Sequence, residues 1–167
     1  MVLMKKEKLN KLLTKVFLKH KLSKTHAKIC SDALVNAELV GATGHGVSRL
    51  KMYCDRIRKK LINPKPKFKF KKISQSIMQI DADDSIGFVA ADIGIKKAIE
   101  SAKKTGLGLV GIKRSGHYGL SGYYAEQAVK KNLLTLIFTN APPAIAPHGA
   151  LKTSVSYTHL TLPTKNE

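Results

Sequence analysis

The stretch "TGLGLVGIKRSGHYGLSG", residues 105–122, contains two glycine patterns that point to different folds. The first, G-x-G-x-x-G at 106–111, has the spacing of a dinucleotide-binding fingerprint, which must follow a strand and open a helix. Here a helical pattern precedes Gly106 and "GLGLVGIK" is typical of a strand, so the match is in the wrong place. The second pattern, "GHYGLSG" at 116–122, lies between that strand and the next helical pattern. Ligands of open α/β sheets bind at such junctions, and we expect the function there.

The first third of the chain predicts helices. Residues 5–20 repeat apolar side chains at helical spacing, and Ser23 or Thr25 can cap a second helix. A glycine-rich turn, "GATGHGVSRL" at 41–50, leads into a third helix. The two prolines of "NPKP" at 63–66 exclude a helix interior, so this segment marks the best internal boundary.

Beyond that boundary, strand patterns and helical patterns follow one another. They cover residues 68–73, 76–81, 87–104, 106–113, 119–131 and 133–140. The third and fifth of these are typical of helices and the others of strands, and the last is apolar enough for a buried strand. Short strand–helix–strand links favour parallel strands with right-handed crossovers. The predicted fold class is therefore α/β, an N-terminal helical segment followed by a βαβαβ sheet unit.

The net charge raises an alternative function, a basic nucleic-acid-binding or interaction module. The chain has 167 residues and a formal net charge of +19. All but four of its 30 basic residues are lysines, spread along the whole sequence, whereas phosphate clamps and base readers favour arginine. The lysines of "KPKFKFKK" at 65–72 are typical of a protected edge strand. We therefore expect no specific nucleic-acid partner.

The composition also predicts where the protein works. No apolar run reaches the roughly 20 residues that cross a bilayer, and the first residues show no secretory signal. We expect a cytoplasmic protein with no membrane partner. Cys30 and Cys54 lack CxxC spacing, so we expect reduced, packed thiols.

Three polar features could carry chemistry. "GHGVSR" places Arg49 four residues after His45 at the entry to the third helix, "SGHYG" flanks His117 with small residues, and "FTNAPPAIAPHGA" contains His148. Histidine suits proton exchange at an alcohol oxygen near neutral pH, and arginine suits a carboxylate. A histidine beside glycines is also an ordinary turn residue. A metal hydrolase built on the three histidines is a further alternative, but acidic ligands at suggestive spacing are missing and we expect no metal site.

Five motifs resemble, in order, the malate/L-lactate dehydrogenase family of type 2. They are "ALVNAELVGATGHGVSRL", "INPKP", "DADDSIGF", "SGHYGLSGYYAEQA" and "TNAPPAIAPHGA". That family also contains sulfolactate, ureidoglycolate and diketogulonate oxidoreductases and an imino-acid reductase. Any one motif is weak, whereas the ordered set is specific and covers about residues 5–150.

The resemblance implies an oxidoreductase with a non-Rossmann α/β fold that uses NAD or NADP. Such an enzyme transfers a hydride between the nicotinamide and a small 2-hydroxy or 2-keto acid, and is a homodimer at full length. His45 and His117 would be the catalytic histidines, Arg49 the ligand of the substrate carboxylate and Tyr53 a further substrate contact. The implied cofactor-binding positions are Gly44, Thr139, Asn140, Pro147, His148 and Gly149. Which histidine holds the proton, which acid reacts and which of the two cofactors binds stay open at this point.

We expect three parts along the chain. Residues 1–62 form the helical segment with the first active-site motif, and residues 63–150 form an incomplete α/β cofactor-binding segment. Family members continue well beyond Ala150, whereas "SYTHLTLPT" in residues 151–167 resembles a translated sequencing adapter. We therefore expect a non-native tail on a fragment that is inactive or aggregates when made alone.

Overall fold

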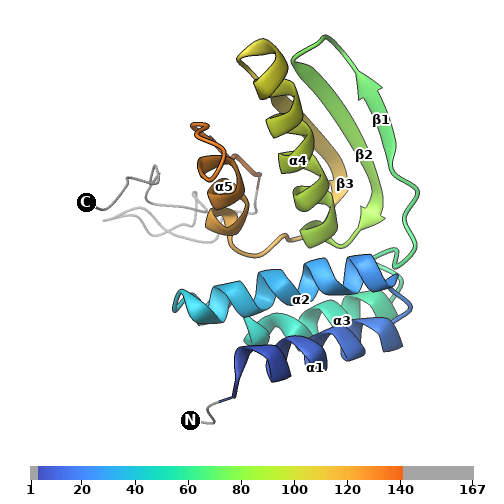
Figure 1. Ribbon diagram of the computed structural model, residues 1–167. Coiled ribbons are helices and arrows are strands. Elements are labelled where there is room, and N and C mark those ends of the chain that lie inside the picture. The colour runs from blue at the N-terminus through green and yellow to red at the C-terminus, as the bar shows by residue number, and fades with distance from the viewer. Residues whose placement is uncertain (1–3, 141–167) are drawn as a thin grey trace, which may run out of the picture.

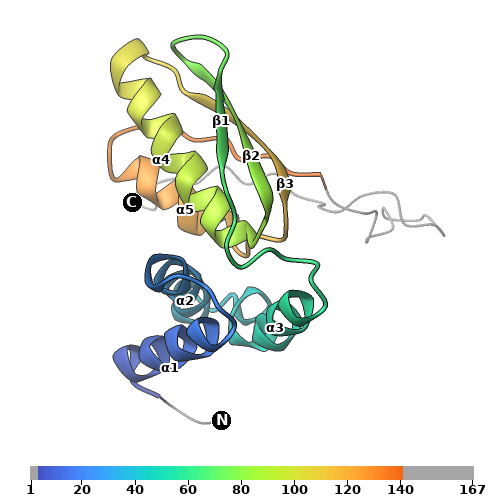
Figure 2. The same cartoon turned by 90° about the vertical axis from the view of Figure 1, so that its right-hand side faces the viewer.

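The structure, a computed structural model, describes residues 4–140 (Figure 1). Its first part is a layer of helices, and its second part is a small sheet with helices on one side, as the two views in Figures 1 and 2 show. The predicted α/β class, a helical segment followed by a sheet unit, is confirmed. None of the described helices is both long and apolar enough to span a membrane.

The helical segment consists of α1 (Lys6–Lys19), α2 (Lys24–Leu39) and α3 (Leu50–Arg58). The Ser23 hydroxyl accepts the His26 N–H at 3.2 Å, so Ser23 is the residue that caps α2. The apolar stripes of the three helices meet in one core. Its members from this segment include Leu13, Phe17, Ala27, Cys30, Leu34, Tyr53 and Ile57. Both cysteines of the chain are buried free thiols, as predicted.

The sheet has the order β1 (Lys69–Lys72), β2 (Ile77–Ser85), β3 (Leu109–Ser115). β1 pairs with β2 antiparallel, and β2 pairs with β3 parallel. The crossover between the parallel strands is α4 (Gly87–Thr105), which packs on β2 and β3. Gly106 ends this helix with a left-handed backbone, φ +79°. The G-x-G-x-x-G match therefore begins at a helix end, as predicted, and is not a nucleotide-binding loop.

The outer elements of the sheet unit also agree with the sequence patterns. Every residue of β1 is exposed, so its lysines lie on a solvent-facing edge strand. α5 (Ser121–Val129) packs against α4 after a short loop from β3. Asn132 follows α5 with a left-handed backbone, φ +58°, which is typical of an asparagine near a helix end.

Residues 133–140 do not form the predicted buried strand. Leu134, Leu136 and Phe138 are 82%, 55% and 74% exposed. Within the described residues β3 pairs only with β2, and no strand of this part of the chain pairs with residues 133–140. An apolar run becomes a buried strand only where another strand completes its hydrogen bonds and an opposing layer covers it. The local sequence pattern does not show whether that neighbouring strand and that layer exist.

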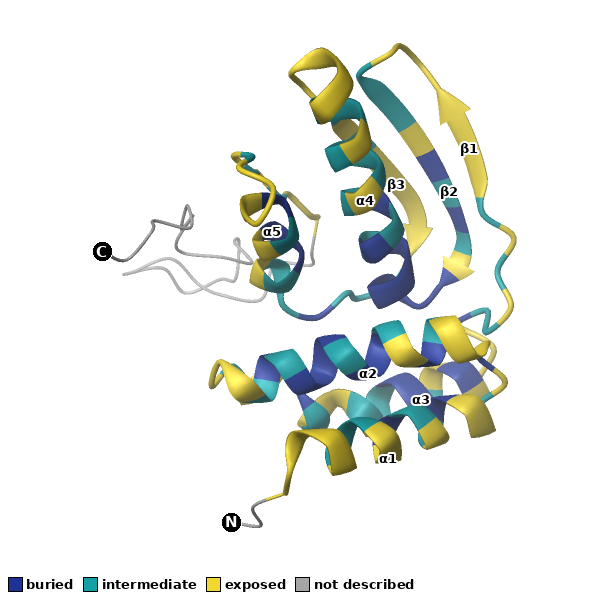
Figure 3. Cartoon of the chain, in the orientation of Figure 1, coloured by how far each residue is buried: buried dark blue, intermediate teal, exposed yellow. Residues whose placement is uncertain are grey.

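The core lies where the helical segment meets the N-terminal end of α4, which Figure 3 shows as a band of buried residues. The rings of Tyr53 and Phe88 pack there with centroids 4.8 Å apart, and neither side chain is exposed. Burial of a side chain such as Phe88 contributes about 1.5–3 kcal/mol. This contact holds the carboxyl edge of the sheet over the helices.

Gly87, the first residue of α4, lies directly against the loop that follows β3. A Cβ built on Gly87 would be 2.2 Å from the carbonyl oxygen of Gly116 and 2.4 Å from that of His117. Both obstacles are backbone atoms, so a larger residue would displace the loop itself.

We predict that Gly87→Ala lowers the free energy of unfolding by about 1–3 kcal/mol, the usual cost of overpacking. The matched control is Gly111→Ala, where a built Cβ meets nothing within 4 Å. That control should leave stability unchanged or raise it by about 0.5 kcal/mol, because alanine costs less backbone entropy in a strand than glycine. Urea denaturation followed by circular dichroism measures both. Equal stability of the two variants would contradict the close approach at Gly87.

Candidate active site

The loop between α2 and α3 folds into two short 3₁₀ turns, η1 (Thr43–His45) and η2 (Val47–Arg49). The Glu38 carboxylate at the end of α2 accepts the Val47 N–H at 2.7 Å. Gly46 makes room for that carboxylate, since a Cβ there would lie 2.1 Å from Glu38 Oε1. Glu38 therefore fixes this loop against α2.

Arg49 is oriented by its own loop. Its Nε donates to the Gly44 carbonyl at 2.8 Å, and the neighbouring Ser48 hydroxyl donates to the Thr43 carbonyl at 2.7 Å. Arg49 is exposed, and it takes part in none of the ion pairs between residues 4 and 140. Both Nη groups can therefore bind a carboxylate in the bidentate manner that arginine favours.

His117 lies in the loop that leaves β3 at the carboxyl edge of the sheet, where the second glycine cluster was expected to act. The Gly116 N–H donates to the Ser85 carbonyl at 3.3 Å. Gly119 has φ +80°, and a Cβ there would be 2.6 Å from the Phe88 ring. Its N–H donates to His117 Nδ1 at 3.2 Å. The loop thus turns tightly around the imidazole.

The two histidine loops meet, although they are far apart in the sequence. The rings of His45 and His117 have centroids 6.0 Å apart and planes inclined by 17°. The Tyr53 hydroxyl lies 2.7 Å from His117 Nδ1. The Arg49 charge acts on both His117 and Tyr53. The structure therefore brings together His45, Arg49, Tyr53 and His117.

Burial controls the ionisation of the groups at this junction. It lowers the pKa of His117 from its ordinary value of 6.5, and positive charge at His45, Arg49 and Arg56 lowers that pKa further. Burial also raises the pKa of Tyr53, so its hydroxyl keeps its proton at neutral pH. Between the lowered pKa of His117 and 6.5, the unfolded chain binds more protons than the folded one. Stability therefore rises with pH in that window.

Tyr53, expected as a substrate contact, is buried, whereas the predicted cofactor positions within the described residues are exposed. Tyr53 is fully buried, so in the described structure it contacts His117 and not solvent. Thr139 and Asn140 lie on the exposed segment after α5, where the Thr139 hydroxyl donates to the Asn140 carbonyl at 3.2 Å. Three predicted cofactor positions, Pro147, His148 and Gly149, and the expected tail at 151–167 lie outside the described residues.

Two surface hollows of the described residues lie away from the histidine pair. One runs along α3 between Ser48 and Leu61, and another lies between Lys21 and Pro66. Neither of these two hollows is lined by His45 or His117. In the same range, no three His, Cys, Asp or Glu side chains lie close enough to hold a metal ion.

Sequence reasoning missed the residues that support the site. Three contacts hold the loops in place. The Glu38 carboxylate accepts the Val47 N–H, Gly87 packs against the carbonyl groups of the loop after β3, and the Gly119 N–H donates to His117 Nδ1. The only sequence signal was the glycines themselves, since a glycine at the first position of a helix, as in "SIGF", indicates a close neighbour.

We predict that His117 titrates below 6.5, because burial disfavours its charged form. Arg49→Gln should raise this pKa by removing a nearby positive charge. Arg58→Gln is the matched control, since Arg58 is paired with Asp55 and is not among the charges acting on His117. Proton NMR of the imidazole C2–H against pH measures all three proteins. A pKa at or above 6.5, or equal shifts in both variants, would show that this environment is wrong.

Comparisons with known proteins agree with the resemblance. The family model described as malate/L-lactate dehydrogenase matches residues 4–158, which continues past the boundary expected at Ala150. The malate/(S)-sulfolactate dehydrogenase of Methanothermus fervidus is 40% identical over 128 residues, which are 77% of this chain and 38% of that protein. The malate dehydrogenase of Pyrococcus horikoshii is 36% identical over 164 residues, 97% of this chain and 46% of that protein.

The fold agrees as well. The solved structure of the Pyrococcus horikoshii malate dehydrogenase superposes with a TM-score of 0.84 at 35% identity, and covers 91% of this chain and 44% of that one. The chain thus spans less than half the length of these relatives. With a family model that matches residues 4–158 of 167, this chain belongs to the malate/L-lactate dehydrogenase family.

Proposed function

We propose that the protein of family length is an NAD(P)-dependent oxidoreductase of the malate/L-lactate type, and that residues 4–140 supply one wall of its active site. The observation that supports this most directly is the convergence of His45, Arg49 and His117 from two loops of different halves of the fold. These groups suit a small 2-hydroxy or 2-keto acid. The two imidazoles can act on its C2 oxygen, and the guanidinium, which forms no ion pair within the described residues, can bind its carboxylate.

Arg49 is proposed to bind the carboxylate. Its Nε is already engaged by the Gly44 carbonyl at 2.8 Å, which fixes the plane of the guanidinium and leaves the Nη edge outward. A bidentate charge-assisted pair of this kind contributes about 1.5–3 kcal/mol per hydrogen bond. Because the guanidinium is oriented before the acid arrives, little of this is lost in ordering it.

His117 is proposed to act as a neutral hydrogen-bond donor to the oxygen on C2. The Gly119 N–H can only donate, so His117 Nδ1 accepts it and the proton of the neutral ring is on Nε2. The Tyr53 hydroxyl, which keeps its proton, lies 2.7 Å from the same nitrogen and shares its single lone pair with the Gly119 N–H. The lowered pKa of His117 keeps the ring neutral at pH 7. Its Nε2–H then stabilises negative charge that develops on the substrate oxygen.

His45 is proposed to exchange the hydroxyl proton. It is half-buried beside His117, with nearly parallel rings, and sits on the loop that Glu38 fixes. With His117 held in one tautomer by Gly119, His45 is the imidazole left to take the proton in oxidation and return it in reduction. This division of roles assigns the proton to the first histidine.

The cofactor is proposed to bind across the open side of this wall. When bound, NAD or NADP supplies the acceptor or donor of a hydride at C2 of the acid. Gly44 leaves space beside His45, since a Cβ built there meets nothing within 4 Å, and Thr139 and Asn140 are exposed. We propose these residues, with Pro147, His148 and Gly149, as its contacts. The family resemblance supports a homodimer for the protein of family length, and we propose that this protein works in the cytoplasm.

The test is steady-state oxidation of malate, L-lactate and sulfolactate with NAD and with NADP, in a protein of family length that contains this segment. We predict that His45→Ala lowers kcat by about 10²–10⁴-fold, the usual contribution of general acid–base catalysis. Arg49→Ala should act chiefly on KM, raising it about 10-fold or more. His20→Ala, at the end of α1, is the matched control and should keep parental kinetics. Parental kinetics in both His45→Ala and Arg49→Ala would overturn the assignment.

A further inference from the structure

We propose that Arg114 is the positioning residue of the His117 loop. It would act through the carboxylates of Asp83 and Asp84, which fix the place where β2 and β3 lose their register. The inference rests on the proposed function only in taking His117 as an active-site residue. The structural part of it concerns the end of the sheet and can be tested without turnover.

The two strands are out of step immediately before His117. Their pairing is regular up to Asp81 opposite Lys113 and resumes at Ser85 opposite Ser115. Between these pairs β2 has residues 82–84, while β3 has only Arg114. A bulge of this kind bends its strand and redirects the residues that follow. Here the residues that follow are Gly116 and His117.

The bulge is held in an unfavourable backbone conformation. Asp83, Asp84 and Arg114 have φ of +52°, +56° and +54°, in the left-handed region. Aspartate tolerates this region better than arginine, for which it costs of the order of 1–2 kcal/mol. Three together persist only if other contacts determine them, and such clusters gather at functional sites.

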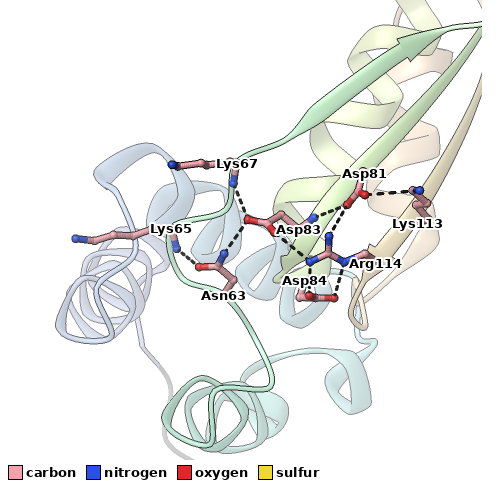
Figure 4. Close-up of polar contacts among 8 residues, drawn as sticks. All are labelled: Asn63, Lys65, Lys67, Asp81, Asp83, Asp84, Lys113 and Arg114. Atoms are coloured by element: carbon pink, nitrogen blue, oxygen red, sulfur yellow. Dashed lines mark hydrogen bonds and ion pairs between the residues drawn. The ribbon is translucent and has the colours of Figure 1, made fainter.

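The Arg114 guanidinium makes those contacts, as Figure 4 shows. Its Nη2 lies 2.6 Å from Asp84 Oδ2 and 3.0 Å from Asp83 Oδ1, and its Nη1 lies 3.3 Å from Asp81 Oδ1. One planar group thus binds three carboxylates of β2 across the bulge. Lys113, by contrast, reaches only Asp81, at 3.7 Å.

The cluster extends to the segment that leaves the helices. Asp83 Oδ2 accepts the Lys67 N–H at 3.0 Å and the Asn63 side-chain amide at 2.9 Å (Figure 4). The Asn63 N–H also donates to the Asp84 carbonyl at 2.9 Å. Residues 63–67 follow α3, the helix that carries Tyr53. The carboxylates that bind Arg114 therefore also connect the sheet to the segment that follows α3. The Tyr53 hydroxyl of that helix contacts His117.

Close backbone contacts connect the bulge to His117. The Gly116 N–H is bonded to the Ser85 carbonyl, the residue at which pairing resumes. Gly87 packs against the carbonyl groups of Gly116 and His117, so the loop cannot move toward α4. We therefore expect a change in the bulge to shift the imidazole relative to Tyr53 and His45.

The test compares Arg114→Gln with Lys113→Gln, a neighbouring change of equal charge that removes only the long contact to Asp81. The readout is the pair of imidazole ¹⁵N shifts of His117 in the protein of family length, at a pH where the ring is neutral. In the parent and in Lys113→Gln, Nδ1 should give the signal of an unprotonated nitrogen. In Arg114→Gln the two shifts should converge toward those of a freely exchanging histidine. Parental shifts in Arg114→Gln would overturn the proposal.

Asp84→Asn is the second variant, because asparagine tolerates the left-handed backbone and keeps the side-chain volume while it removes the charge. It should reproduce the convergence of the shifts while the chain stays folded, and shifts equal to the parent's would also overturn the proposal. In the protein of family length, both variants should lower kcat about 10- to 100-fold with KM within about twofold, because Arg49 is untouched.

The two proposals can fail separately. Altered His117 shifts in Arg114→Gln, together with parental turnover in His117→Ala, would support the positioning role and reject the catalytic role proposed for His117. Turnover that depends on His117 but survives Arg114→Gln would reject the positioning role alone.

Discussion

The hydrogen bond between the Tyr53 hydroxyl and His117 Nδ1, at 2.7 Å, joins the two halves of this fold. Tyr53 belongs to α3 of the helical segment, and His117 belongs to the loop that leaves the sheet. A buried hydrogen bond of this type adds only about 0.5–1.5 kcal/mol to stability. Its importance is geometric, because it fixes the imidazole relative to α3. Arg49 and His45 lie in the loop that leads directly into this helix.

The rest of the site depends on how closely the two loops can approach this bond. The Phe88 ring packs on Tyr53 in a tilted arrangement, Gly87 leaves room for the loop after β3, and Gly119 turns that loop back toward the imidazole. Each contact excludes an alternative position for His117 by steric overlap with backbone or with a fully buried ring. These contacts hold His117 in one position before any ligand binds, which is the pre-organisation that the proposed function requires.

Periodicity and turn chemistry predicted most of the fold. The helical stripes, the glycine end of α4 and the lysine-rich edge strand follow from local sequence, and the second glycine cluster lies at the predicted junction between a strand and a helix. The buried strand at 133–140 could not be judged locally, because its burial depends on partners outside the pattern. The ordered motifs identified His45, Arg49 and His117, whereas Glu38 and the Arg114 cluster act through contacts that no spacing reveals.

The central claim is that His45, Arg49 and His117 serve one small acid. Its most direct test is a titration of the protein of family length with oxamate, an unreactive analogue of a 2-keto acid, followed by the imidazole signals of both histidines. The account predicts that the two sets of signals move together with a single dissociation constant, and that Arg49→Lys weakens this constant for both alike. Movement of only one histidine, or two unrelated dissociation constants, would contradict it.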